Sequence, residues 1–243
     1  MVLWPDTFTD NVAPHVAQAA VEVLEGAGMA VELPPAGLCC GRPLYDFGML
    51  TLARRTLRRV LDVIGEQIHA RVPVVALEPS CVAVLRDELV EMLPGDDDAH
   101  RLSAQTHTLG ELLTHEVPDF APAPLERRVV VQSHCHHRAI MGLDSDRRVL
   151  DAPGLEVEHF GEACCGMAGS FGYESEKYGV SVRIGERAIL PAVRAADPST
   201  LILDDGFSCR SQIADGTGRH ALHLAEVLRM AGRENGAASG ERS

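Results

Sequence analysis

The sequence predicts an α/β protein made of two duplicated domains, each a small, mostly parallel sheet with flanking helices. Two adjacent cysteines followed by glycine occur twice, at Cys39-Cys40-Gly41 and at Cys164-Cys165-Gly166. Both motifs lie within the same alternation of short apolar strands and helical stretches, which is typical of parallel sheets covered by helices. One further cysteine follows each motif. Cys39 therefore maps to Cys164 at an offset of 125 (164 − 39), and Cys81 maps to Cys209 at an offset of 128 (209 − 81).

The first copy begins with a short apolar strand at residues 2–4, which ends at Pro5. Apolar residues at helical spacing predict a helix over 11–25, because Pro14 falls in its first turn and Gly26 follows its last. The same periodicities predict the remaining elements in order: strand 29–33, amphipathic helix 49–68, buried strand 72–77, helix 82–92, loop 94–98 and a closing helix at 106–114.

A linker is predicted at residues 116–127, since three prolines lie between Glu116 and Pro124. The second copy then repeats the order: strand 128–132, helix 139–150, strand 155–159, helix 174–190 and strand 200–203. The predicted domains are therefore residues 1–115 and 128–231. Residues 232–243 are polar and rich in glycine, alanine and serine, so we expect a disordered tail there.

The composition is that of a soluble globular protein, with 46% hydrophobic and 23% charged residues. The net charge of −13 repels phosphate backbones, so we expect no nucleic-acid partner. No apolar run approaches the roughly 20 residues of a membrane-spanning helix, and the start of the chain has no signal-peptide pattern. We expect a cytoplasmic location, peripheral to a membrane only through a partner. In that compartment, seven cysteines favour metal or redox chemistry over structural disulfides.

Four cysteines of the second copy form the principal candidate site: Cys135, Cys164, Cys165 and Cys209. They follow successive predicted strands, and the carboxyl ends of parallel strands are where open α/β sheets build their sites. Four thiolates suit zinc or an iron–sulfur cluster. Adjacent cysteines favour the cluster, because they strain to reach one zinc ion but can bind different irons. Buried apolar cysteines and a vicinal disulfide switch are the alternatives.

The first copy offers a second, incomplete site of three cysteines, Cys39, Cys40 and Cys81. The position equivalent to Cys135 is held by Thr7, at the same offset of 128 (135 − 7). A threonine hydroxyl is a poor iron ligand. This half has therefore lost its cluster, holds one with an exchangeable corner, or has become a substrate or thiol pocket, and the residues do not decide among these.

Polar residues surround the cysteines. His134, His136 and His137 flank Cys135, and one of them could be a metal ligand or a proton donor; the alternative is that they support the site or face solvent. Arginines follow both motifs, and they could hold a carboxylate or lie in solvent.

The doubled motif resembles the cysteine-rich CCG-domain proteins. These include the B subunit of heterodisulfide reductase and the iron–sulfur subunits of glycolate oxidase, lactate-utilisation and anaerobic glycerol-3-phosphate dehydrogenase systems. The phrases at 3–8 (LWPDTF) and 162–172 (EACCGMAGSFG) resemble the C-terminal part of fused FAD-linked 2-hydroxy-acid oxidases. The resemblance covers residues 1 to 230, and implies clusters bound by cysteine and a role in electron transfer or thiol/disulfide chemistry. Some members close each domain with Cys-x-x-Cys; here Val84 and Gln212 hold the final positions.

These observations predict an iron–sulfur electron-transfer subunit or domain of an oxidoreductase, with a cluster of the 4Fe–4S type. It would accept electrons from a flavin site that oxidises a 2-hydroxy acid such as lactate or glycolate. The chain has no FAD-binding region and no ferredoxin cysteine run, so the resemblance implies FAD on a partner or a missing domain, and a ferredoxin-type partner. The alternatives are a zinc-stabilised structural or partner-binding module and a thiol/disulfide reductase subunit. The substrate, the electron acceptor and the oligomeric state are not encoded in recognisable residues.

Overall fold

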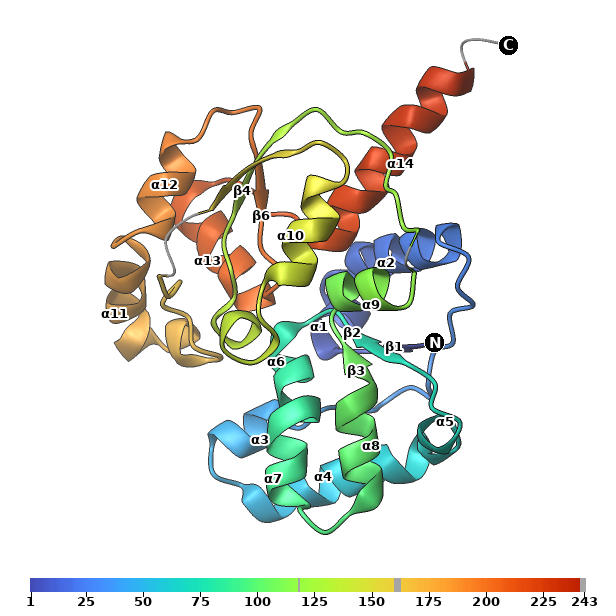
Figure 1. Cartoon of the computed structure of the whole chain (residues 1–243). Helices are drawn as coiled ribbons and strands as arrows, with labels where there is room; N and C mark the ends of the chain where they lie inside the picture. The colour runs from blue at the N-terminus through green and yellow to red at the C-terminus, as the bar shows by residue number, and fades with distance from the viewer. Residues whose placement is uncertain (118, 160–162, 241–243) are drawn as a thin grey trace. The chain divides into compact units, whose positions relative to one another are not determined.

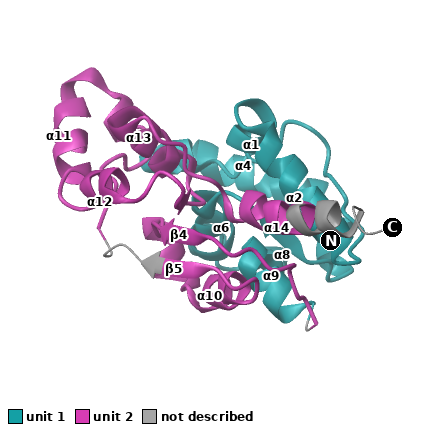
Figure 2. Cartoon of the chain, turned by 90° about the horizontal axis from the view of Figure 1, so that it is seen from above, with its two compact units in different colours: residues 1–118 teal, residues 119–243 magenta. Residues whose placement is uncertain are grey.

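The computed structural model describes residues 1–117, 119–159 and 163–240. The chain divides into two compact units, residues 1–118 and 119–243 (Figures 1 and 2). The division falls inside the predicted linker at 116–127. Among the described residues, no helix combines the length and apolar character that crossing a membrane requires.

The first unit is built on a parallel sheet of three short strands in the order β1-β2-β3. β1 (Val2–Trp4) and β2 (Val74–Ala76) are entirely apolar and buried, and β3 (Thr106–His107) completes the sheet. The strand expected at 29–33 is reduced to one parallel bridge between Glu32 and Val2.

Four helices of the first unit, α1, α6, α8 and α9, begin at a side chain that caps them. Asp6 accepts hydrogen bonds from the backbone of Phe8 and Thr9 at the start of α1. The helices, in chain order, are α1 (Thr7–Asn11), α2 (Pro14–Gly26), α3 (Arg42–Asp46), α4 (Leu50–Val63), α5 (Gly65–His69), α6 (Pro79–Ala83), the π-helical turn η1 (Val84–Glu88), α7 (Leu89–Met92), α8 (Asp97–Gln105) and α9 (Leu109–His115).

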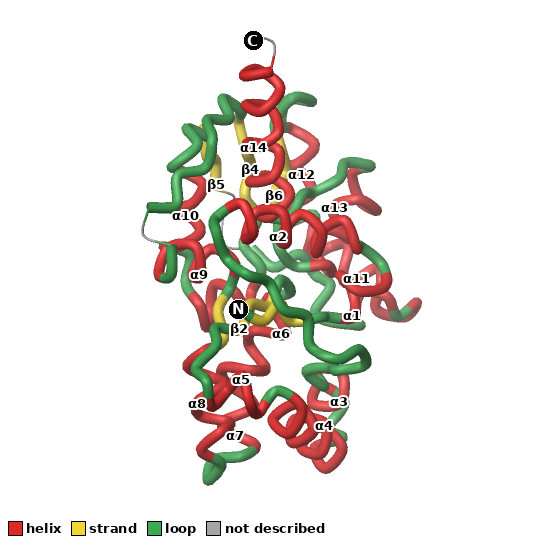
Figure 3. Tube along the Cα trace, turned by 90° about the vertical axis from the view of Figure 1, so that its right-hand side faces the viewer, coloured by secondary structure: helices red, strands yellow, loops and turns green. Residues whose placement is uncertain are grey.

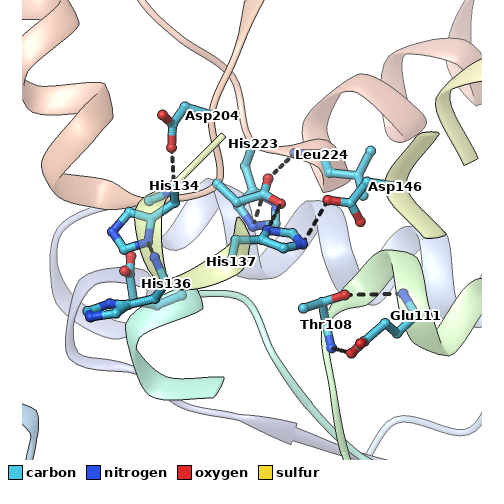
Figure 4. A network of polar contacts seen from close by, with 12 residues as sticks. Thr108, Glu111, His134, His136, His137, Asp146, Asp204, His223 and Leu224 are labelled. Carbon is cyan, nitrogen blue, oxygen red and sulfur yellow. Dashed lines mark hydrogen bonds and ion pairs between the residues drawn. The ribbon is translucent and has the colours of Figure 1, made fainter. Parts of the chain in front are cut away.

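Two expectations for this unit need correction. The sequence indicated only a loop before the closing helix, whereas Asp96 caps helix α8 by accepting from the backbone of Asp98 and Ala99. The closing helix was expected from 106, but residues 106 and 107 form β3. α9 starts later because Thr108 and Glu111 form a reciprocal capping box (Figure 4).

The second unit repeats the parallel sheet in the order β5-β4-β6, as Figure 3 shows. The strands are β4 (Arg128–Val131), β5 (Glu156–His159) and β6 (Leu201–Leu203). Its helices are η2 (π-helical, His137–Met141), α10 (Asp144–Asp151), η3 (3₁₀, Phe171–Tyr173), α11 (Ser175–Gly185), α12 (Ile189–Ala195), α13 (Phe207–Thr217) and α14 (Leu224–Gly240).

Helix boundaries in this unit differ from expectation at three places. The helix expected over 174–190 ends at Gly185, and Pro191 lies in the first turn of α12, where a backbone N–H has no intrahelical acceptor. Helix α13 was not predicted. α14 continues to Gly240, where a disordered tail was expected from 232, because alanine favours helix despite the glycines; residues 241–243 lie outside the described residues.

The registers of the two sheets establish the duplication. Val2 and Leu3 of β1 pair with Val74 and Val75 of β2. Adding 128 to each number gives the pairs of the second sheet, Val130 with Ile202 and Val131 with Leu203. The predicted fold class, two duplicated α/β domains with small parallel sheets, is confirmed.

Candidate metal centres

Two cysteines of the second copy lie in the apolar core that packs against the sheet. Cys165 and Cys209 are 6% and 2% exposed, and they pack in a cluster with Val130 of β4 and Ile202 of β6. Cys209 is the third residue of α13, directly beyond the carboxyl end of β6, and its thiol donates to Cys165 Sγ at 3.1 Å. Two sulfurs that come from segments 44 residues apart therefore meet at one point.

The other two cysteines lie on the solvent side of this pair. Cys135 starts the helical turn after β4, and it is exposed, as is Cys164. The backbone N–H of Gly166 donates to Cys164 Sγ at 3.3 Å. The charge of Cys135 contributes to the pKa of both Cys164 and Cys209, so these four cysteines influence one another electrostatically.

The four thiols of this group differ in the direction in which their pKa values are shifted. Hydrogen bonds from Cys164 and Cys209 lower the pKa of Cys165, and the nearby His134 lowers it further. The hydrogen bond to Cys165, followed by burial, raises the pKa of both Cys164 and Cys209, while burial raises the pKa of Cys135. The lowered pKa favours the thiolate form of Cys165, and four thiolates together would require a cationic centre to neutralise their repulsion.

Gly166 is required by the packing behind this site. Its φ is +96°, and a Cβ there would overlap the backbone carbonyl oxygen of Ser181 in α11. The equivalent Gly41 has φ +80°, but its added Cβ would make only ordinary contacts, with the side chain of Thr56 at 3.5 Å and the backbone of Ala53 at 4.0 Å. The two glycines share a backbone conformation and differ in available space.

Replacing Gly166 with alanine is therefore expected to destabilise the protein more than replacing Gly41. Both changes carry the cost of a positive φ, about 1 kcal/mol. Only G166A also forces backbone apart, which adds roughly 1–3 kcal/mol. Chemical denaturation of both variants checks this order, and equal loss of unfolding free energy would contradict the packing argument.

The first copy forms the same sulfur arrangement with one position changed. Cys40 and Cys81 are buried with their Sγ atoms 3.1 Å apart, and the backbone N–H of Gly41 donates to Cys39 Sγ at 3.4 Å. The side chain of Thr7, the first residue of α1, lies near Cys39 and acts to lower the pKa of this thiol, which other causes raise overall. Thr7 thus occupies the place that Cys135 takes in the second copy.

Electrostatics distinguish the two sulfur groups. The pKa of Cys81 is raised overall: its hydrogen bond with Cys40 lowers it, but burial and the carboxylates of Asp6 and Glu78 outweigh that effect. Both of these acids are buried. The pKa values of Cys39 and Cys40 are raised as well. The position of Asp6 corresponds to His134 at the offset of 128 (134 − 6), so an acid replaces a histidine beside the first site and disfavours thiolates there.

The three histidines around Cys135 separate into two groups (Figure 4). His134 and His136 stay beside Cys135: their rings lie 5.3 Å apart, and each offers a ligand atom within 4.8 Å of the thiol and of the other. His137 is buried and turns away, with Nε2 3.0 Å from Asp146 Oδ2 and Nδ1 3.9 Å from Asp205 Oδ2. His134 and His136 can therefore adjust the cysteine site, whereas His137 belongs to a separate buried network.

This network ties four segments of the second unit together. Asp205 also lies 3.4 Å from His223 Nε2 and accepts from the backbone of Leu224 at the start of α14. Burial alone would raise the pKa of Asp205, but the charges of His223 and His137 lower it. Both ring nitrogens of His137 face carboxylates, so His137, Asp146 and Asp205 form one buried polar cluster. Asp205, Asp146 and His223 were not among the residues expected from the sequence; an acidic pair following a buried strand was the available signal.

The arginines beside the motifs bind partners within their own unit. Arg210 donates to the backbone oxygens of Asp204 and Asp205, which fixes the turn before Cys209. Arg42 forms ion pairs with Asp46 and Glu88. Neither is a solvated loop arginine.

Comparison with known proteins gives consistent matches. The family model described as a cysteine-rich domain, CCG, matches residues 6–86 and 129–214, one segment in each unit. The chain is 30% identical over 231 residues to a subunit of the anaerobic glycerol-3-phosphate dehydrogenase of Escherichia coli (strain K12), which covers 92% of this chain and 57% of the relative. It is 31% identical over 242 residues to "Lactate utilization protein A" of Geobacillus kaustophilus, at 93% of this chain and 97% of the relative. The protein of the same description from Bacillus subtilis is 23% identical with the same coverage.

Proposed function

The chain belongs to the CCG cysteine-rich domain family, and from that premise we propose that its second unit binds an iron–sulfur cluster of the 4Fe–4S type. The ligands would be Cys135, Cys164, Cys165 and Cys209. The observation that carries the proposal is the meeting of the Cys165 and Cys209 sulfurs, 3.1 Å apart, beyond the carboxyl end of one parallel sheet, with Cys135 and Cys164 near enough to influence the pKa values of this pair.

The residues present fit such a group. Four cysteine thiolates are the usual ligand set of a 4Fe–4S cluster. The glycine after the pair leaves backbone beside the sulfurs free of side chain, and its N–H already donates to Cys164 Sγ. Cys165 and Cys209 would anchor the group from the core, while Cys135 and Cys164 face the side that a redox partner can approach. A bound cluster would supply one-electron chemistry.

The proposed role is electron transfer within an oxidoreductase. Two relatives are described as part of a glycerol-3-phosphate dehydrogenase and as a lactate utilization protein, which supports a catalytic partner that oxidises a hydroxylated substrate. We place FAD and oxidation of a 2-hydroxy acid of the lactate or glycolate type on that partner, and a ferredoxin-type protein or domain as a further one. The chain spans 57% of the length of the Escherichia coli relative, so substrate and partners are proposals for the larger assembly.

Two alternative functions would use the cysteines of the chain differently. A zinc-stabilised module would use the same four cysteines without redox activity. A thiol/disulfide reductase would use the Cys40–Cys81 pair, whose 3.1 Å separation suits it. The raised pKa values of both thiols count against that second alternative, because the thiolate is the reactive form.

The test is optical reduction of the protein purified without oxygen. We expect broad visible absorption that bleaches when dithionite is added. In a separate sample, the same absorption should bleach when a flavin-dependent 2-hydroxy-acid oxidase and its substrate are added. Bleaching by dithionite but not by the oxidase would support the proposed cluster and contradict the proposed flavin partner. A colourless protein with one bound zinc would establish the structural module instead.

A further inference from the structure

Helix α4 presents a cationic surface that the rest of the first unit does not use. Its buried side consists of Ala53, Leu57, Val60 and Leu61. Its solvent side carries Arg55, Arg58 and Arg59, and among the described residues none forms an ion pair or hydrogen bond with these three. With Arg54 and Asp62, the helix has a net charge of +3 (4 − 1) in a chain whose net charge is −13.

Exposed apolar side chains adjoin these arginines. Phe47 and Met49, in the turn that leads into α4, are 62% and 54% exposed, and Leu52 in the first turn of the helix is 44% exposed. Leu52, Arg55 and Arg59 lie at i, i+3 and i+7, so they share one stripe of the helix. We call Phe47, Met49, Leu52, Arg55, Arg58 and Arg59 the α4 face.

The helix that carries the α4 face also supports the loop of the first cysteine group. A Cβ on Gly41 would lie 3.5 Å from Thr56 and 4.0 Å from Ala53, so the Cys39-Cys40-Gly41 loop rests on α4. An α-helix is about 10–12 Å across with its side chains. Leu52 and Arg59 lie next to Thr56 around the helix, so a molecule bound to the α4 face would lie within about one helix diameter of that loop.

We propose that the α4 face is the docking surface for an acidic redox protein, which approaches the first unit through carboxylates around an apolar centre. This inference rests on the proposed electron-transfer function. Arginine is enriched in protein interfaces together with aromatic residues and methionine, and an apolar centre with a charged rim is the usual anatomy. Three arginines without internal carboxylate partners supply complementary charge and steer encounter.

An anionic membrane fits this surface less well. Interfacial helices bury a continuous apolar side in the lipid, whereas the apolar side of α4 is buried in its own unit and only one end of the α4 face is apolar.

The test measures binding of a small ferredoxin of net negative charge to the intact protein at low and moderate ionic strength. The variant is Arg55→Glu with Arg59→Glu. The matched control is Arg183→Glu with Arg187→Glu, an equal change of charge in and just after α11, the helix behind the second motif. Thermal unfolding of each variant verifies the fold, and a basic cytochrome c is the control for the sign of the charge.

The expected result is ferredoxin binding that weakens with salt, is reduced about tenfold or more by R55E/R59E, and is nearly unchanged by R183E/R187E. Phe47→Ser is expected to weaken binding while retaining the salt dependence. No ferredoxin binding, equal loss in both double variants, or tighter binding to phosphatidylserine vesicles or to a second copy of the chain would overturn the proposal. Iron and sulfide content, measured on the same samples, reports on the cluster separately.

Discussion

Replacement of Cys209 by serine is expected to reduce the bound iron and sulfide to background, a loss of more than about tenfold. Cys209 is 2% exposed and lies 3.1 Å from Cys165, so no other side chain can take its place without moving the core. Serine keeps the size but not the soft thiolate that iron requires. Iron and sulfide analysis after anaerobic purification measures the loss directly.

Two further variants test whether the loss of iron and sulfide in C209S comes from a lost ligand and not from a disturbed core. Cys81→Ser changes the equivalent residue of the first copy, and it is expected to leave the iron and sulfide of the second site in place. Cys135→Ser removes an exposed ligand, so it should lose the cluster without disturbing the core. Full iron and sulfide content in C135S and C209S would show that the ligands lie elsewhere.

Replacement of Thr7 by cysteine is expected to have the opposite effect and to raise the metal content of the first site. Thr7 is exposed, starts α1 and lies near Cys39, so a thiol there would complete the set with Cys40 and Cys81. The expected result is an increase in iron and sulfide per chain on reconstitution, by up to about twofold if the second site is full.

Thr7→Ser is the control, because it retains a hydroxyl and adds no thiol. T7C combined with Cys39→Ser should return to the wild-type content. No gain in T7C would contradict the prediction; one cause could be the buried carboxylates of Asp6 and Glu78, since they raise the pKa of Cys81 and disfavour an additional thiolate. Substituting Asp6 by His, the residue of the second copy, in the T7C background would separate that cause from a wrong alignment.

Much of the candidate site could be predicted because the duplication supplies an internal comparison. The offset of 128 between Cys81 and Cys209 also relates the register of the two sheets, and it places Thr7 opposite Cys135. The apolar strands at the start of each copy and the repeated Cys-Cys-Gly motif were enough to predict this correspondence. The fold class followed from the same evidence.

Other features depend on contacts that no local pattern contains. Asp205 meets His137 and His223 only because β4, β6 and the start of α14 converge, and each residue alone resembles an ordinary polar residue. The segment expected to be a strand at 29–33 forms only a single bridge, because the extent of an edge strand depends on its pairing with the neighbouring strand. Helix α8 was missed because its mostly polar residues, with only Ala99 and Leu102 buried, give little periodicity.

The most direct test of the account is elemental: iron, zinc and acid-labile sulfide per chain in protein purified without oxygen. We predict iron and sulfide in equal amounts, about four of each per chain for one 4Fe–4S cluster, with little zinc. One equivalent of zinc without sulfide would contradict the proposal and make the second unit a zinc-stabilised module.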